Sequence, residues 1–234
     1  MEKIKAAIFD MDGTLLDSMQ FWKFCPELYI KAFGLKPEPG LGEKLFSMSM
    51  KQGAEFLKVE YKLRISTLEI CNGINKILRD AYGNEISFKP EAENFLKELK
   101  SSGTTTVLCT NTDRELFTPA LKRLNAEKYF DRIFTTAEMK MSKEQPEIFY
   151  ALSEYLKTEP QETWVFEDAL YALRTAKNAG FKTCGIYDES FKKYTEKIKK
   201  YCTIYCKNYK EAKDFFFKEH PISGHKARII IRSK

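Results

Sequence analysis

The stretch KIKAAIFDMDGTLLD, from Lys3 to Asp17, decides the fold of this chain of 234 residues. Its largely apolar run, Ile4 to Phe9, is short and biased toward β-branched and aromatic residues, which is typical of a strand buried on both faces of a parallel sheet. Gly13 then gives the backbone the freedom to turn, so the strand is expected to end at Asp10 and Asp12. Ligands bind at the carboxyl ends of strands in open α/β sheets, and two carboxylates two residues apart can reach one ligand. The pair therefore indicates a site rather than a surface turn.

Apolar strands alternate with amphipathic helices along most of the chain, which predicts an α/β fold with a doubly wound, Rossmann-like parallel sheet. Further strands are expected at 104–110, 132–135, 163–166, 182–187 and 202–205. The helices between them are expected from Pro90 to a stop at Gly103, and at 114–125, 146–157, 169–179 and 209–217.

Residues 18–88 interrupt this alternation, because they contain no convincing strand. Their helical segments are expected at 21–33, 43–61 and 66–82, separated by the turn-rich GLKPEPGLG and closed by NEISFKP. We therefore predict an inserted helical unit at 18–88, a core made of 1–17 and 89–218, and a C-terminal tail or edge strand at 219–234. The aromatic cluster after the first motif is expected to form the core of the insertion rather than a substrate platform; it consists of Phe21, Trp22 and Phe24.

The composition is that of a water-soluble globular protein, with 43% apolar and 31% charged residues. No apolar stretch approaches the roughly 20 residues of a membrane helix, and the N-terminus does not resemble a signal peptide. The six cysteines are therefore expected to be reduced in a cytoplasmic protein. The net charge of +6 is spread over many amphipathic segments, which favours a solvated surface or weak steering of an anionic substrate over nucleic-acid or membrane binding. The sequence does not distinguish a monomer from a homodimer.

Polar residues occupy equivalent positions at several strand ends or helix starts: Asp10 and Asp12, Thr110 and Asn111, Lys143, and Glu167 and Asp168. Parallel strands end at one edge of the sheet, so these side chains are expected to meet there. Carboxylates suit Mg²⁺, and an ammonium and a hydroxyl suit phosphate oxygens. Taken singly, each has a structural explanation, such as a turn at Asp12-Gly13 or a helix N-cap at Glu167-Asp168.

The motifs DMDGT (10–14), LCTN (108–111), Lys143 and FEDA (166–169) resemble, in order, those of the haloacid dehalogenase-like superfamily of phosphohydrolases. The similarity extends from Ile4 to about Phe217 and is greatest to the branch of β-phosphoglucomutase and phosphoglycolate phosphatase, in which a helical cap domain follows the first strand. One departure is the third motif, where members commonly have Gly-Lys-Pro-x-Pro and this chain has SKEQP at 142–146.

The resemblance implies a role for each motif residue. Asp10 would be the nucleophile and Asp12 the general acid and base. Mg²⁺ would be held by Asp10, the backbone carbonyl of Asp12 and Asp168, with Glu167 supporting these ligands. The phosphoryl oxygens would be bound by Thr110, Asn111 and Lys143.

The function implied is a Mg²⁺-dependent phosphatase that hydrolyses a small phosphorylated metabolite through an aspartyl-phosphate. A sugar phosphomutase of the β-phosphoglucomutase type is the alternative, although Thr14 favours the phosphatase because such mutases often carry an aliphatic residue there. A dehalogenase proper would need neither the acid at Asp12 nor a divalent metal. A non-catalytic binding protein on the same fold would not need every acid of the motifs.

Overall fold

Strand β1 (Ala6–Phe9) lies inside a six-stranded parallel sheet with the order β3-β2-β1-β4-β5-β6. The computed structural model describes residues 4–45 and 48–218. The other strands are β2 (Thr105–Thr110), β3 (Arg132–Thr135), β4 (Thr163–Glu167), β5 (Lys182–Ile186) and β6 (Ile204–Cys206). The expected doubly wound α/β sheet is confirmed, with strand limits within two residues of those predicted.

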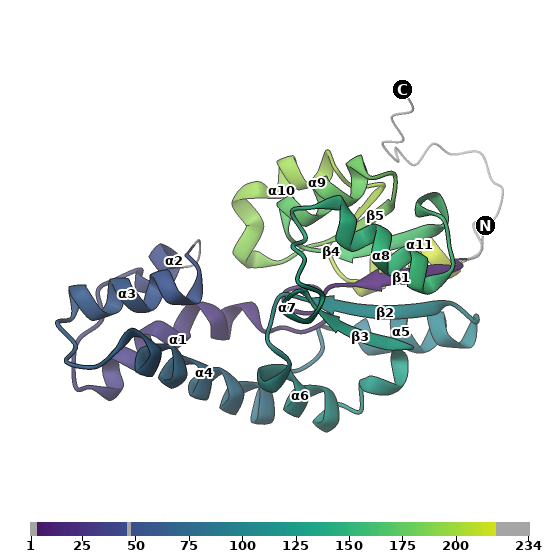
Figure 1. Cartoon of the computed structure of the whole chain (residues 1–234). Helices are drawn as coiled ribbons and strands as arrows, with labels where there is room; N and C mark the ends of the chain where they lie inside the picture. Colours follow the sequence, from purple (N-terminus) through teal and green to yellow (C-terminus); the bar gives the residue numbers. More distant parts are fainter. Residues whose placement is uncertain (1–3, 46–47, 219–234) are drawn as a thin grey trace.

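Helices cover both faces of the sheet (Figure 1). The core helices are α5 (Ala92–Ser101), α6 (Arg114–Arg123), α7 (Thr136–Met139), α8 (Pro146–Leu156), α9 (Leu170–Asn178), α10 (Thr195–Lys199) and α11 (Tyr209–Phe217). The prediction that Pro90 lies in the first turn of a helix is wrong. Helix α5 begins two residues later, because its N-cap Glu91 has a left-handed backbone with φ of 65°. The short helices α7 and α10 were not expected from the sequence.

The side chains of β1 alternate between two hydrophobic layers, which explains its continuous apolar sequence. Ala7 and Phe9 belong to the layer beneath α5, α6 and α11, where Phe9 stacks on Phe166 with ring centroids 4.3 Å apart. Ala6 and Ile8 belong to the layer beneath α8 and α9. The strand is thus fixed from both sides, and so is the position at which it ends.

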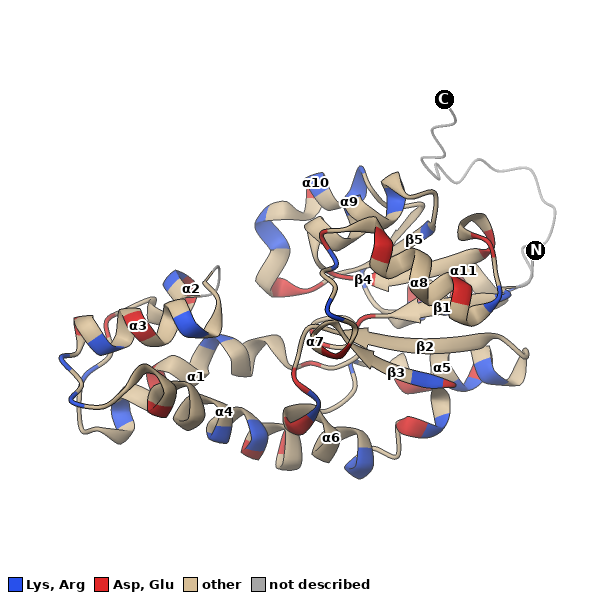
Figure 2. Ribbon diagram, in the orientation of Figure 1, with Lys and Arg blue, Asp and Glu red and all other residues tan. Residues whose placement is uncertain are grey.

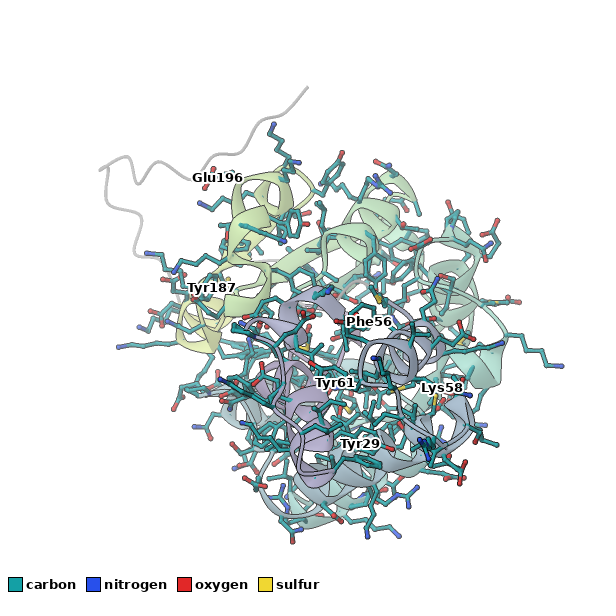
Figure 3. The ribbon with its side chains drawn as sticks, turned by 90° about the vertical axis from the view of Figure 1, so that its left-hand side faces the viewer. Tyr29, Phe56, Lys58, Tyr61, Tyr187 and Glu196 are labelled. Carbon is teal, nitrogen blue, oxygen red and sulfur yellow. The ribbon has the colours of Figure 1, made fainter. Side chains whose placement is uncertain are left out.

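The inserted unit contains α1 (Met19–Ala32), α2 (Leu41–Leu45), α3 (Met50–Glu60) and α4 (Thr67–Asn84). The continuous helix predicted for 43–61 is wrong, because Ser49 starts a new helix. Its side chain accepts a hydrogen bond from the backbone N–H of Gln52, and the Gln52 side chain accepts one from the backbone N–H of Ser49. This inserted unit, residues 18–88, is called the cap below. Its helix α4 packs along α6, and the cap extends from one end of the core (Figure 1). In Figure 3 the cap helices, with Tyr29 and Phe56, face the viewer, and Tyr187 marks the core beside them.

The two segments that connect cap and core run side by side. The Asp17 N–H donates to the Ser87 carbonyl at 2.9 Å, and the Lys89 N–H donates to the Leu15 carbonyl at 2.8 Å. Lys89 also forms a largely buried ion pair with Asp188, at 2.8 Å, which ties the second segment to the end of β5. This pairing supports the predicted domain limits near residues 17 and 89, which stay a prediction.

Lys and Arg are distributed over both lobes and are interspersed with acids (Figure 2). In the described part of the chain, no helix is long and apolar enough to cross a membrane. All six cysteines are free thiols. The predicted C-terminal tail, 219–234, lies outside the described residues.

Candidate active site

Asp10 and Asp12 lie where β1 ends, in a tight turn. Gly13 has φ of +79°, a left-handed conformation that favours glycine, and the N–H groups of Leu15 and Leu16 both donate to the Met11 carbonyl at 2.9 Å. Asp10 is only 8% exposed. The turn therefore holds a carboxylate in the protein interior, where it needs compensating charge.

Lys143 supplies part of that charge. Its ammonium lies 2.5 Å from Asp10 Oδ1 and 2.9 Å from Glu167 Oε1, and the side chain is 2% exposed. The sequence departs from the common motif beside this lysine, but a turn replaces the missing proline. The Gln145 N–H donates to the Ser142 carbonyl at 3.0 Å, and the Glu144 N–H donates to the Ser142 hydroxyl at 3.2 Å.

Glu167, the last residue of β4, uses both carboxylate oxygens inside the protein. Oε1 accepts from Lys143, and Oε2 accepts from the backbone N–H groups of Asp168 and Ala169, each at 2.9 Å. Glu167 therefore positions Lys143 and the backbone that carries Asp168. The predicted role of Glu167 in supporting the metal ligands stays a prediction.

Asp10, Glu167 and Asp168 form a buried cluster in which one carboxylate oxygen of each lies within 4.8 Å of the others. Asp10 Oδ2 and Asp168 Oδ2 are buried and have no hydrogen-bond partner among the residues that the structure describes. A methyl group at Gly13 would lie 2.1 Å from Asp168 Oδ2, so glycine keeps the space beside that oxygen open. Two carboxylate oxygens without partners next to a fixed turn fit a hard divalent cation.

Burial and mutual repulsion act on these carboxyl groups. Burial, followed by the charge of Glu167, raises the pKa of Asp10 to about 7, although Lys143 opposes the shift. The pKa of Asp168 is raised for the same two reasons. Burial alone would lower the pKa of Lys143, but the carboxylates of Asp10 and Glu167 raise it well above its ordinary value. The lysine is thus a permanent cation, and the acids still lack full compensation.

Asp12 is held by three hydroxyl groups. Oδ1 accepts from Ser18 at 2.6 Å and from Tyr82 at 2.5 Å, and Oδ2 accepts from Thr112 at 2.7 Å. Burial raises the pKa of Asp12, and these three hydrogen bonds oppose the shift. The Asp12 side chain is therefore oriented by hydroxyl groups, whereas Asp10 is oriented by an ammonium.

Thr110 and Asn111 lie at the end of β2, on the wall of the same pocket. The Thr110 hydroxyl accepts from the Thr112 N–H at 3.1 Å, and its own proton is left to donate. The Asn111 amide is exposed and donates to the Tyr171 hydroxyl at 2.7 Å. The structure thus brings together every site residue predicted from the sequence: Asp10, Asp12, Thr110, Asn111, Lys143, Glu167 and Asp168.

The comparison with known families agrees with this arrangement. The family described as haloacid dehalogenase-like hydrolase matches residues 7–186. The chain belongs to this family. It is therefore a hydrolase, and the resemblance seen in the motifs is confirmed.

Relatives of this haloacid dehalogenase-like hydrolase differ in activity. The phosphorylated carbohydrates phosphatase of Thermotoga maritima is 25% identical over 179 residues, which cover 76% of this chain and 83% of the relative. The (S)-2-haloacid dehalogenase 4A of Burkholderia cepacia is 27% identical over 195 residues, covering 80% and 84%. The structure of CbbY from Rhodobacter sphaeroides, in complex with xylulose-(1,5)bisphosphate, matches with a TM-score of 0.72 and 19% identity over 89% of this chain and 96% of that one. The family and its phosphatases support a phosphoric monoester hydrolase, and the structural match shows the fold.

The hydrolase site also contains residues that the sequence did not predict. Ser18 and Thr112 are hydroxyl residues close to the first two motifs, a proximity that could have indicated them. Tyr82 comes from the end of α4, and no local pattern marks it. Its partner Trp22 donates from Nε1 to the Tyr82 hydroxyl at 3.0 Å and lines the pocket.

The expectation that the aromatic cluster after the first motif forms the core of the cap holds only in part for Trp22, which packs against the hydrophobic core but also lines the pocket. It is wrong for Phe24, which is 50% exposed. Phe21 is partly buried against the hydrophobic core, as expected.

Proposed function

We propose that this protein is a Mg²⁺-dependent phosphatase that hydrolyses a small phosphorylated metabolite through an aspartyl-phosphate on Asp10. The main observation in support is that two neighbouring acids, Asp10 and Asp12, have different hydrogen-bond partners. Asp10 lies against Lys143, and its other oxygen has no hydrogen-bond partner in the described part of the chain, whereas Asp12 is surrounded by hydroxyl groups. The first setting suits a nucleophile beside a phosphoryl group, and the second suits a proton carrier.

In the first step, a carboxylate oxygen of Asp10 attacks phosphorus, and the bond from phosphorus to the leaving oxygen breaks. Asp12 donates its proton to that oxygen, so that the product leaves as a neutral alcohol. Lys143 and the Thr110 hydroxyl bind the oxygens of the phosphoryl group as it is transferred. Asn111 contributes from the same strand end.

In the second step, the Asp12 carboxylate removes a proton from a water molecule, which attacks phosphorus and releases inorganic phosphate. Asp10 is regenerated as a carboxylate, and Asp12 is protonated again, which completes the cycle. The three hydroxyl donors on Asp12 keep its side chain in one orientation for both proton transfers.

Asp10, Asp168 and the backbone carbonyl of Asp12 would hold Mg²⁺, which offsets the repulsion between the nucleophile and the anionic phosphoryl group. Glu167 would keep the metal ligand Asp168 in position, since its carboxylate accepts a hydrogen bond from the Asp168 backbone N–H. The free oxygens of Asp10 and Asp168 support this assignment.

The arrangement of the site fits dehalogenation less well than phosphate ester hydrolysis, although a dehalogenase is among the relatives. A halide leaves as an anion and takes no proton, so the first of the two proton transfers proposed for Asp12 would have no purpose there. A binding protein would have no need for Lys143 to lie directly against the nucleophile.

The test is incubation with Mg²⁺ and a panel of phosphate monoesters that includes p-nitrophenyl phosphate, with released phosphate and isomerised substrate measured separately. We expect phosphate release that requires Mg²⁺ and that falls by a factor of about 10³ or more in Asp10→Asn. Isomer formation without phosphate would favour the phosphomutase, and full activity of Asp10→Asn would refute the nucleophile. Glu115→Gln, an exposed residue of α6 that is not among the residues lining the pocket, serves as the matched control.

A further inference from the structure

The pocket above the acids extends from the end of the sheet into the cap and has a volume of about 760 Å³. Its cap wall is built by α1, α2, α3 and α4 and is mainly apolar. The side chains that define it include Trp22, Pro26, Leu45, Met50, Ala54 and Ile74. From the described part of the cap, the polar side chains on this wall are Ser49 and Asn75. The leaving group of a substrate bound at Asp10 would lie against this wall.

The charged side chains that line the pocket are all acidic in the part of the chain that the structure describes. None of the described residues that line it is Lys or Arg. Apart from the four acids at its floor, the charged lining residues are Asp113 and Glu144, both exposed on the core side. Lys143 lies beneath the floor, between Asp10 and Glu167. Two cap lysines, Lys23 and Lys44, pair with Glu43 and Glu38, and Lys51 is exposed beside the lining residue Met50 without lining the pocket itself.

This arrangement has a direct consequence for the leaving group. The phosphoryl group would meet positive charge from Lys143 beneath the floor and from the cation that Asp10 and Asp168 would hold. A carboxylate or a second phosphate on the leaving group would meet an apolar wall without a cation, and Asp113 and Glu144 would repel it. A sugar would lose hydration from several hydroxyl groups and find few partners on the cap. An apolar group would be buried without such a cost.

We propose that the substrate is a phosphate monoester whose leaving group is uncharged and largely apolar, and that the cap wall around Trp22, Ile74 and Asn75 selects it. This inference rests on the proposed phosphatase function. It separates this chain from enzymes whose substrates carry a second anionic group.

The experiment compares substrates of one length with Mg²⁺ present: hexyl phosphate, 5-carboxypentyl phosphate and 5-aminopentyl phosphate, with glucose 6-phosphate as the polar uncharged case. We expect kcat/KM for hexyl phosphate to exceed that of every other member, and that of the carboxylate by about tenfold or more. A higher kcat/KM for the carboxylate, the amine or the sugar would overturn the inference and leave the phosphatase function standing.

A binding arm keeps the inference testable if no ester is hydrolysed. Calorimetric titration with hexylphosphonate and 5-carboxypentylphosphonate, which cannot be hydrolysed, should give about tenfold tighter binding of the apolar ligand. Tighter binding of the apolar phosphonate without turnover would refute the phosphatase function and support the selectivity. Equal binding, or tighter binding of the carboxylate, would overturn the selectivity.

A positive charge introduced on the cap wall of the pocket tests whether this wall selects the leaving group. Asn75→Lys puts a cation into the pocket and should raise the relative kcat/KM for 5-carboxypentyl phosphate by about tenfold. Asn72→Lys is the matched control, because Asn72 is exposed on the same helix and does not line the pocket. It should leave the ratio unchanged. A ratio that does not move in Asn75→Lys would refute selection by the cap wall.

Discussion

The hydroxyl of Tyr82, near the end of cap helix α4, donates a 2.5 Å hydrogen bond to Asp12 Oδ1, just beyond core strand β1. Tyr82 is fully buried and receives a hydrogen bond from Trp22 of α1. The cap is therefore bonded directly to the proposed acid and base. Displacement of the cap would remove one of three groups that orient Asp12, which couples the position of the cap to proton transfer.

Tyr82→Phe should slow the step in which Asp12 protonates the leaving oxygen. We expect kcat/KM for an alkyl phosphate to fall by about tenfold, the usual worth of a hydrogen bond to a charged group. With p-nitrophenyl phosphate, kcat/KM should change little, because nitrophenolate leaves without a proton. Tyr29→Phe removes the hydroxyl of another buried cap tyrosine and should spare both substrates. An equal loss on both substrates would assign Tyr82 a purely structural role.

Lys143→Met should lower both the free energy of unfolding and the rate of phosphate release, and a second substitution should restore only the first. The substitution leaves the buried carboxylates of Asp10 and Glu167 without their cation, which costs about 3–5 kcal/mol in unfolding free energy when no metal is present. Adding Glu167→Gln removes one of the two charges and should restore part of that stability, but not phosphate release. Urea denaturation in EDTA and an activity assay measure the two effects. A single variant as stable as the natural protein would contradict the proposed charge balance.

The fold was predictable where a local pattern had one solution. The apolar run before Asp10 is typical of a strand covered on both sides, and β1 indeed contributes to both hydrophobic layers. The helix predicted across Ser49 failed because amphipathic spacing continues through the break. A capping box, Ser49 with Gln52, was present in the sequence as the signal for a new start.

The site was predictable to the extent that it depends on strand ends. Asp10, Lys143, Glu167 and Asp168 meet because parallel strands end at one edge. Tyr82 could not be found in this way. Its hydroxyl reaches Asp12 across 70 positions of sequence because α4 packs along α6, and that packing follows from tertiary contacts rather than from a local motif.

Gly13→Ala should weaken metal binding more than folding. Gly13 and Gly34 both have positive φ, 79° and 71°, so alanine costs about 1–2 kcal/mol of backbone strain at either position. Of the two positions, Gly13 is the one where the new methyl group would lie 2.1 Å from Asp168 Oδ2, whereas at Gly34 no atom of the described residues lies within 4 Å. We expect the Mg²⁺ concentration for half-maximal activity to rise by about tenfold or more in Gly13→Ala only, since a ligand must move.

The Mg²⁺ titrations of the two variants decide this prediction, with thermal unfolding to show that both proteins fold. Equal Mg²⁺ dependence in Gly13→Ala and Gly34→Ala would mean that Asp168 Oδ2 does not face the cation. The assignment of Asp168 as a ligand would then be wrong.

The raised pKa of Asp10 links stability to pH in the metal-free protein. Its ordinary value is 3.8 and its folded value is about 7, so the folded state binds a proton more tightly than the unfolded state. The stability from this group is complete below pH 3.8 and is lost as the pH rises through about 7. Mg²⁺ bound at the proposed site would need the carboxylate, so it would stabilise the protein most where that proton is already gone.

We therefore expect saturating Mg²⁺ to raise Tm more at pH 8 than at pH 5. Asp10→Asn cannot titrate at this position, so its metal-free Tm should fall less between these two pH values than that of the natural protein. Thermal unfolding of both proteins in EDTA and in Mg²⁺ provides the four comparisons. If Mg²⁺ raised Tm equally at both pH values, protonation of Asp10 would not compete with the metal, and the two would not share this carboxylate.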